Sequence, residues 1–200
     1  MAERQTRARQ TRQQSRQRIV VAATELVRRR AYPELSVDEV MREAGMGRTI
    51  FYRHFDDLAD LLLRASREAV DELYDAQRTI GHARPDEEPE ALGRALRAAV
   101  AVYHRHGPLL RAVTEAAAGD EQIARDHAAL RTRFDDFVEE SLRGLADLSR
   151  TPPADVAETA RALNLMNESY LLDAFGREPR VSPETAVQTL TEVWDAVIRR

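Results

Sequence analysis

Apolar residues recur at intervals of three and four along most of the chain, which is the spacing of one face of an α-helix. Alanine is abundant, and runs of β-branched residues, which are typical of strands, are absent from the sequence. The pattern therefore predicts an all-α protein. The expected helices, about nine in total, span roughly residues 16–30, 37–44, 48–55, 58–79, 89–106, 109–118, 120–148, 154–175 and 183–200.

Residues that begin or end helices set these boundaries. Gly107 and Pro108 are expected to separate the fifth helix from the sixth, because proline has no backbone N–H and disfavours a helix interior. Asp56 or Asp57 is the expected N-cap of the fourth helix, and Pro183 the first residue of the last one. Polar loops containing proline are expected between the fourth and fifth helices and between the seventh and eighth.

The most informative stretch is Leu35–Phe55, LSVDEVMREAGMGRTIFYRHF, which predicts two short helices joined by a turn with two glycines. Ser36 can cap the first helix, and Glu39, three residues on, completes a capping box. Gly45 stands where a helix C-terminus favours a left-handed residue, a conformation that glycine adopts without steric cost. The stretch is typical of a helix-turn-helix, whose second helix enters the major groove of DNA.

The second helix of this motif carries a polar face. Its apolar residues are expected to point inward, which leaves five residues to face outward: Arg48, Thr49, Tyr52, Arg53 and His54. Side chains of these types can donate hydrogen bonds to phosphate oxygens, and arginine can also pair with a guanine edge. Capped helices joined by a glycine turn also occur in proteins that never bind DNA, so the spacing alone leaves both interpretations open.

Charge is distributed unevenly between the two parts of the chain. Residues 1–55 contain 12 arginines and 6 acidic residues, whereas the whole chain has a net charge of −4. The first 18 residues hold 6 arginines and a single acidic residue, Glu3, which predicts a flexible basic arm along phosphates or in a minor groove. A solvated tail without DNA contacts is the alternative. Because DNA would repel the acidic remainder, we expect only the N-terminal part to bind it.

Composition narrows the possible functions further. The absence of cysteine excludes disulfides and thiolate metal sites. No apolar run approaches the ~18–20 residues of a membrane span, and no secretory signal follows the basic N-terminus, so we expect a cytoplasmic protein without membrane contact. The five histidines have no metal-binding spacing, and no glycine-rich phosphate loop or nucleophile motif occurs. We expect neither an enzyme nor a cofactor nor a bound metal.

Two groups of motifs resemble a known family. The strings SVDEV and AGMGRTIFYRHF, with F-Y-x-x-F at Phe51, Tyr52 and Phe55, are similar to the DNA-binding domain of the TetR family of bacterial transcriptional regulators. The string ALNLMNE at 162–168 and Trp194 in EVWDAV resemble the ligand-binding domain of its EthR subgroup, named after the ethionamide-resistance repressor. The resemblance covers essentially the whole chain after the basic arm.

This resemblance implies three parts: a flexible basic arm over 1–15, a helix-turn-helix DNA-binding domain over 16–55, and a ligand-binding and dimerisation domain over 56–200. It implies a homodimer through the eighth and ninth helices, which binds double-stranded DNA at a palindromic operator. A small apolar effector would occupy a largely apolar cavity and release the protein from the operator, since it binds the other conformer better.

The resemblance also assigns residues to DNA binding, namely Ser36, Arg48, Thr49, Tyr52, Arg53 and His54. Among them Tyr52 matches a phosphate contact, and Arg53 and His54 match positions that vary with the operator. Two residues depart from the family pattern. Gly47 stands where the family usually has serine or threonine, and Leu58 where it usually has lysine, so two phosphate contacts are expected to be missing.

Two asparagines are the polar residues of the expected cavity. Asn164 and Asn167 lie three apart on one helix, hence on one face, and the resemblance implies that they hydrogen-bond the effector. The alternative is that they bond to neighbouring helices or face the dimer interface. Candidate apolar walls, each of which could instead be ordinary core, are Leu92, Leu96, Ala99, Val100, Tyr103, Phe134, Phe137, Val138, Leu171 and Trp194.

The sequence favours a ligand-responsive transcriptional regulator, most simply a repressor. Two other hypotheses remain open at this stage. One is a DNA binder of the same fold that needs no ligand, and the other is a helical carrier of small molecules whose DNA-binding domain no longer functions. Gly47 and Leu58 are the features that keep the second hypothesis open.

Overall fold

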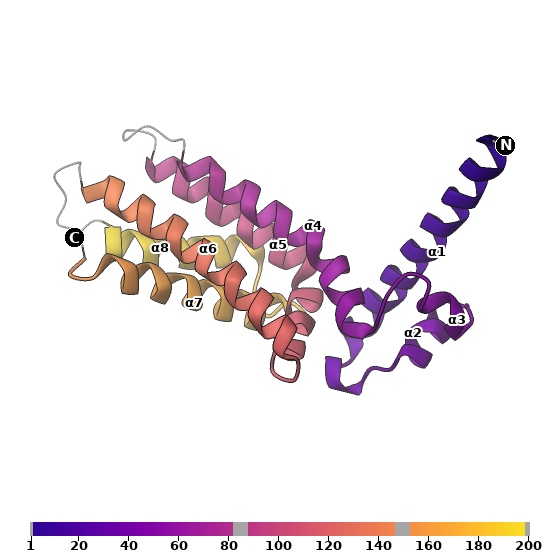
Figure 1. Ribbon diagram of the computed structural model, residues 1–200. Helices are drawn as coiled ribbons and strands as arrows, with labels where there is room; N and C mark the ends of the chain where they lie inside the picture. The colour runs from indigo at the N-terminus through magenta and orange to yellow at the C-terminus, as the bar shows by residue number, and fades with distance from the viewer. Residues whose placement is uncertain (1, 82–87, 147–152, 199–200) are drawn as a thin grey trace.

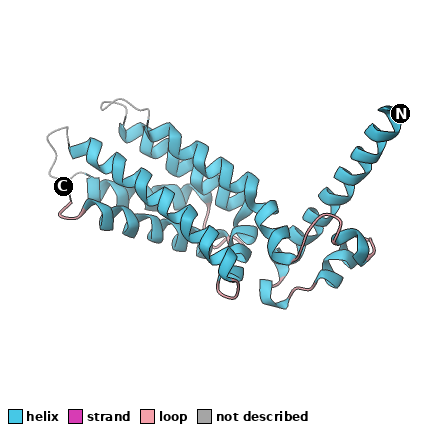
Figure 2. Cartoon of the chain, in the orientation of Figure 1, coloured by secondary structure: helices cyan, strands magenta, loops and turns pink. Residues whose placement is uncertain are grey.

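The computed structural model describes residues 2–81, 88–146 and 153–198, and within them it contains helices and no strands (Figure 2). The all-α prediction is confirmed. The described residues form eight α-helices and one short 3-10 helix rather than nine helices: α1 Ala2–Arg29, η1 Tyr32–Glu34, α2 Val37–Glu43, α3 Arg48–Phe51, α4 Leu58–Gly81, α5 Glu88–Ala117, α6 Glu121–Ala146, α7 Val156–Phe175 and α8 Pro183–Ile198. The loops expected near 81–89 and 149–153 lie largely outside the described residues.

The molecule has two parts, which we call the head (α1, η1, α2 and α3) and the body (α4 to α8) (Figure 1). The body is a bundle of long helices, and α4 leads from the head into it. The first turns of α1 project away from both parts (Figure 1). None of the described helices is long and apolar enough to cross a membrane.

The head has its own small core, built on the apolar faces predicted from the sequence. Ile19 of α1, Met41 of α2 and Phe51 of α3 are almost fully buried there. Phe55 joins them after α3, and Leu58, the first residue of α4, packs against the same cluster. Leu58 therefore packs α4 against the head, which gives the apolar side chain at this position a structural role.

The central helix of the body is α5, which contacts α4, α6, α7 and α8 and also reaches α1 and η1. The main core cluster gathers residues of α5 to α8, including Val100, Leu171, Phe175 and Leu190. Because α5 contacts α1 and η1, it joins the head to the body together with α4.

The predicted break at Gly107–Pro108 was wrong, because α5 runs uninterrupted from Glu88 to Ala117 with Pro108 inside it. A proline in a helix removes one backbone hydrogen bond. Here the following turns are held by burial of Leu109 and Ala112 against the helices of both parts. Tertiary packing on both sides of the proline thus outweighs the local preference.

The N-terminal helix is longer than predicted. The helix was expected from about residue 16, after a flexible arm over 1–15, whereas α1 begins at Ala2. Arginine, glutamine and alanine are strong helix formers, and the segment contains neither glycine nor proline. The basic segment is therefore a helical extension of α1.

The second helix of the motif is shorter than the predicted 48–55, since α3 ends at Phe51. The backbone still turns helically beyond it: the His54 and Phe55 amides donate to the Phe51 carbonyl at 2.8 and 3.0 Å. Other boundaries are as expected. The N-cap of α4 is Asp57, whose carboxylate accepts from the Asp60 amide at 2.8 Å.

Candidate functional site

The turn between α2 and α3 is built from the local signals that the sequence carries. Ser36 is the N-cap of α2, its hydroxyl accepts from the Glu39 amide at 3.3 Å, and the Glu39 carboxylate accepts from the Ser36 amide at 3.0 Å. This reciprocal pair is the predicted capping box, and it satisfies amides that would otherwise lack partners. It fixes where α2 starts.

The end of α2 is equally well defined. Gly45 has φ +65°, as predicted. The Gly45 amide donates to the Arg42 carbonyl and the Met46 amide to the Met41 carbonyl, which is the Schellman pattern that closes a helix. Arg18 of α1 donates to the Ala44 carbonyl at 2.7 Å. The direction in which the chain enters α3 is therefore set by backbone geometry and by α1.

The exposed face of α3 and the turn after it carries the predicted polar residues. Arg48, Thr49, Tyr52 and Arg53 are exposed, and His54 is half-buried. Tyr52 keeps 50% of its surface accessible, which is unusual for so large a ring. Ser36, which was also predicted to contact DNA, is exposed at the start of α2.

Arg48 and Tyr52 form one unit on this surface. The Arg48 guanidinium donates to the Tyr52 hydroxyl at 3.1 Å and lies 5.6 Å from the centre of its ring. It also contacts the Asp38 carboxylate at 3.2 Å. Because these exposed contacts are individually weak, a phosphate that approaches the pair can replace them.

The basic segment of α1 lies beside this surface. Arg12 donates to the Arg53 carbonyl at 3.2 Å. Partial burial, and after it the charges of Arg12, Arg16 and Arg53, lower the pKa of His54. Arg12 and Arg16 of the basic segment thus add positive charge beside α3.

A serine at position 47 could supply the side-chain N-cap that α3 lacks. Gly47 is the N-cap of α3 with φ −77°, it makes no side-chain cap, and a Cβ added there meets nothing within 4 Å. We expect Gly47→Ser to raise the free energy of unfolding by a few tenths of a kcal/mol, because serine caps slightly better than glycine.

Gly45→Ser is the contrasting variant, since Gly45 has φ +65° and its added Cβ would lie 3.3 Å from Arg18. It should lose about 1 kcal/mol of stability, the cost of a left-handed residue with a side chain. Urea unfolding of both variants measures the difference, and equal losses at the two glycines would contradict the assigned turn geometry.

A cavity of about 140 Å³ lies inside the body. Four helices line it: α4, α5, α6 and α7. The walls from α4 and α5 are mainly apolar and include Val70, Leu73, Ala95 and Val113. A cavity bordered by several helices is the kind of space that a small-molecule ligand requires.

The structure brings six of the predicted pocket residues to this cavity: Ala99, Tyr103, Phe134, Asn164, Asn167 and Leu171. The other predicted wall residues do not line it. They pack in the main core of the body instead: Leu92, Leu96, Val100, Phe137, Val138 and Trp194. On α5 and α6 the two sets share inward faces of the same helix, and only the packing decides which residues border the empty volume.

Besides the two predicted asparagines, the wall formed by α6 and α7 carries ionisable residues that the sequence did not suggest. The Glu168 carboxylate lies 2.9 Å from His127 Nε2 and 3.6 Å from Arg131, and all three residues line the cavity. Asp135 is the fourth ionisable residue in this wall. Charged residues scattered along helices usually belong to solvated faces, so nothing in the spacing distinguished these four.

Both asparagines bond to neighbouring helices and also line the cavity. Asn164 donates to the Asp135 carboxylate at 2.8 Å, and the Trp194 indole donates to Asn167 Oδ1 at 3.1 Å. An indole N–H can only donate, so it fixes the oxygen of Asn167 toward Trp194. Among the described residues the NH₂ group of Asn167 has no partner, which leaves a donor for a ligand.

Tyr103 supplies a second donor. Burial, and after it the charge of Glu168, raise the pKa of the Tyr103 hydroxyl, which therefore stays protonated. The described side chains offer this hydroxyl no hydrogen-bond acceptor, and Tyr103 lines the cavity. Nowhere in the described part of the chain do three potential metal ligands of the His, Cys, Asp or Glu type gather.

Two family models match the chain. The model described as "Bacterial regulatory proteins, tetR family" matches residues 19–65, which covers the helix-turn-helix and the start of α4. The model described as "Transcriptional regulator EthR, C-terminal domain" matches residues 92–199. Together they cover the head from residue 19 onward and most of the body.

The chain is also similar to characterised regulators. It is 28% identical over 181 residues to the HTH-type transcriptional regulator EthR of Mycobacterium tuberculosis, covering 88% of this chain and 83% of the relative. It is 25% identical over 185 residues to EthR of Mycolicibacterium smegmatis, covering 88% and 82%.

Solved structures of low sequence identity share the fold. The TetR family regulator PfmR of Thermus thermophilus superposes with a TM-score of 0.73 at 22% identity, covering 91% of this chain and 94% of that one. NalD of Pseudomonas aeruginosa, the secondary repressor of the MexAB-OprM efflux pump, gives a TM-score of 0.70 at 20% identity, covering 94% and 97%.

Proposed function

Since the chain belongs to the TetR family of bacterial transcriptional regulators and carries a C-terminal domain of the EthR type, we propose that it is a repressor released from DNA by a small effector. The observation that carries the proposal is the combination of an exposed polar face on α3 with a cavity in the body. Regulators of this family act by binding DNA and not by catalysis.

The head supports the DNA-binding half of the proposal. Its recognition surface exposes the Arg48–Tyr52 unit, and arginines of α1 lie beside it. Arg48, Thr49 and Tyr52 are proposed to contact phosphates and base edges, with Arg53 and His54 at the end of the recognition turn. Ser36 is proposed as a phosphate contact at the start of α2, where the partial positive charge of the helix end adds to its hydroxyl.

The two C-terminal helices support a dimer. An open groove on α7 and α8 is lined mainly by apolar residues, among them Ala162, Met166, Val193 and Val197. Val193 in this groove keeps 37% of its surface exposed, so it is a candidate for burial against a second copy. A twofold dimer built on these helices would present two heads, and its symmetry would be matched by a palindromic operator.

The cavity supports the effector half of the proposal. Its apolar walls suit a largely apolar molecule, and the unpartnered donors of Asn167 and Tyr103 suit one hydrogen-bond acceptor on that molecule. The surrounding helices include α4, which leads directly into the head. An occupant that shifts these helices would change the position of the head, and DNA and effector would then oppose each other's binding.

The decisive experiment combines DNA binding with a ligand screen. The purified protein is titrated against DNA from the region upstream of its own gene, and a library of apolar compounds is screened for thermal stabilisation. A salt-sensitive, sequence-specific complex that the stabilising compounds dissolve supports the proposal. A complex that no stabilising compound affects indicates a DNA binder without an effector, and stabilisation without any specific complex indicates a carrier.

Asn167→Leu should weaken the response to the stabilising compounds by about fivefold to tenfold, because one hydrogen bond to the ligand is lost. Its affinity for DNA without compound should stay unchanged. Asn167→Asp is the matched variant of similar size, because it keeps an oxygen for the Trp194 indole and replaces the NH₂ donor with a carboxylate oxygen. If compounds release both variants from DNA as readily as the natural protein, the assignment of Asn167 to the effector site is wrong.

A further inference from the structure

A buried arginine outside the cavity joins the two parts of the molecule. Arg111 lies on α5 with only 9% of its surface accessible, which is rare for a charged side chain. Its Nε donates to the Gly176 carbonyl at 2.8 Å, and one terminal nitrogen donates to the Val27 carbonyl at 2.7 Å and the Arg30 carbonyl at 3.3 Å. The other terminal nitrogen pairs with Glu115.

These carbonyls belong to the ends of two helices. Val27 and Arg30 lie at the C-terminus of α1 in the head, and Gly176 is the C-cap of α7 in the body. Carbonyls at a helix C-terminus lack partners within the helix and carry partial negative charge, so a cation is favoured there. A single guanidinium therefore caps one helix of each part at once.

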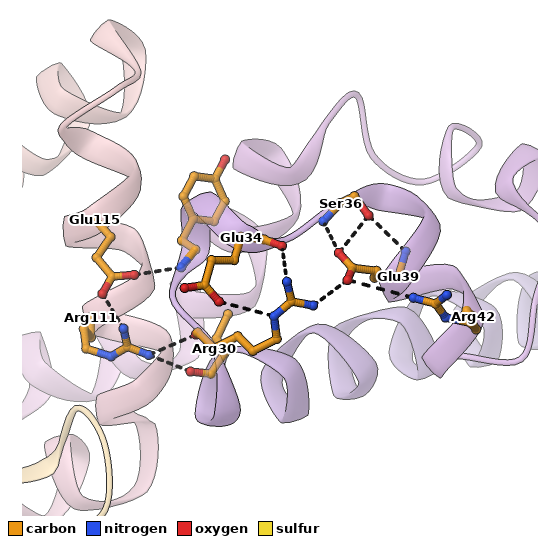
Figure 3. A network of polar contacts seen from close by, with 9 residues as sticks. Arg30, Glu34, Ser36, Glu39, Arg42, Arg111 and Glu115 are labelled. Carbon is orange, nitrogen blue, oxygen red and sulfur yellow. Dashed lines mark hydrogen bonds and ion pairs between the residues drawn. The ribbon is translucent and has the colours of Figure 1, made fainter.

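The contacts continue into the helix-turn-helix (Figure 3). Glu115 accepts from the Tyr32 amide at 2.8 Å, at the start of η1. Arg30 donates to the Glu34 carbonyl at 2.7 Å and pairs with Glu39 of the capping box. Hydrogen bonds from Arg30 and Ser36 lower the pKa of Glu39, which keeps its carboxylate charged. Polar contacts thus run from the end of α7 to the start of α2.

The other end of this chain of contacts borders the cavity. On α5, cavity residues Leu110, Val113 and Thr114 flank Arg111 within one turn. On α7, the Gly176 amide donates to the carbonyl of Leu172, which also lines the cavity. Any movement of α7 relative to α5 that accommodates a ligand would therefore change the distance between Arg111 and its acceptor on Gly176.

We propose that Arg111 is the positioning residue that transmits occupancy of the cavity to the head. With the cavity empty, one guanidinium holds the ends of α1 and α7 together. When an occupant displaces the end of α7, Arg111 loses the Gly176 carbonyl or carries the end of α1 with it, and the helix-turn-helix moves. The inference rests on the proposed function and names the route by which the effector acts.

The test replaces the unidentified effector with a side chain. Ala99→Phe places a phenyl ring from α5 into the cavity. In the full-length natural background it should weaken binding to the upstream DNA fragment by about tenfold or more. In an Arg111→Lys background, which keeps the charge but cannot bridge three carbonyls, the same substitution should change affinity by less than about threefold.

Arg105→Lys is the matched control background. Arg105 lies on the same helix and pairs with Glu72 of α4, so it joins two helices of the body without touching the head. The tenfold effect of Ala99→Phe should persist there. If Arg111→Lys does not fold, Glu115→Gln serves in its place, because it weakens the same junction and should reduce the effect of Ala99→Phe.

The outcomes distinguish the proposed role of Arg111 from the proposed function of the protein. A tenfold effect of Ala99→Phe in all backgrounds overturns the role of Arg111 and leaves the proposed function standing. No effect of Ala99→Phe on DNA affinity in the natural background overturns the proposed effector site and the coupling route together. Loss of the effect in the Arg111 or Glu115 background alone supports the inference, because a merely structural role would weaken DNA binding without removing the response.

Discussion

Replacing Arg48 with alanine and Tyr52 with phenylalanine in the same chain should weaken binding to operator DNA by at least about 100-fold. The double change removes a guanidinium and a hydroxyl from the exposed face of α3, where the two groups contact each other at 3.1 Å. Neither side chain belongs to the core of the head, so the fold should persist. Fluorescence anisotropy over a range of salt concentrations measures the loss, and the salt dependence should become shallower.

The body offers a matched control for this pair. The Arg180 guanidinium lies 5.9 Å from the centre of the Tyr170 ring, nearly the arrangement of Arg48 over Tyr52. Arg180→Ala with Tyr170→Phe should leave DNA affinity within about twofold of the natural protein. Both double variants should sediment as dimers. If the Arg48–Tyr52 double variant binds DNA as tightly as the natural protein, α3 is not the element that reads DNA. If that variant no longer forms dimers, the change has disturbed more than the head.

Gly107→Ala should destabilise the protein by about 3 kcal/mol, although alanine normally improves a helix. A Cβ at this position would lie 2.3 Å from the carbonyl oxygen of Phe175 and 2.7 Å from its carbon. Both are backbone atoms at the end of α7, which cannot rotate away as a flexible side chain would. Either α5 or α7 must shift, and both line the cavity.

Thermal and urea unfolding measure this effect, and about 3 kcal/mol corresponds to a fall in Tm of roughly 6–12 °C for a chain of this size. Gly119→Ala is the control, because an added Cβ there meets nothing within 4 Å and the residue has no positive φ. It should be neutral or slightly stabilising. Equal stability of the two variants would show that α5 and α7 do not approach as closely as described.

Local signals predicted the start of α2 and the turn between α2 and α3, although not the length of α1 or of α3. A capping box, a glycine in the left-handed region and the apolar spacing of short helices act within a few residues, and the sequence displays them directly. Ser36, Glu39 and Gly45 have the predicted roles in the structure. The same kind of signal misjudged Gly107–Pro108, because the packing that keeps α5 continuous comes from residues far away in the chain.

The cavity could be predicted only in part, for a physical reason. Periodicity identifies the inward face of each helix, and it does not tell which inward residues border a void and which fill one. Ala99 and Leu171 border the cavity, whereas Leu96 of α5 and Val138 of α6 pack in the core.

Charged residues that are buried or partly buried in the fold were missed for a different reason. Most hydrogen-bond and ion-pair partners of Arg111 and Glu168 lie far away in the sequence. In the sequence alone, a single charged residue in a helical pattern indicates a solvated face. Their roles follow from the carbonyls and cations that the fold places around them.

The bond between Trp194 and Asn167 gives the protein a built-in optical label. Trp194 is the only tryptophan of the 200 residues, so all indole emission of the chain originates from one ring. That ring is buried in the core, and its N–H donates across α7 and α8 to a side chain at the cavity wall. The wavelength and intensity of this emission therefore follow the polarity and hydrogen bonding at a single point, without a dye and without background from a second fluorophore of the same kind.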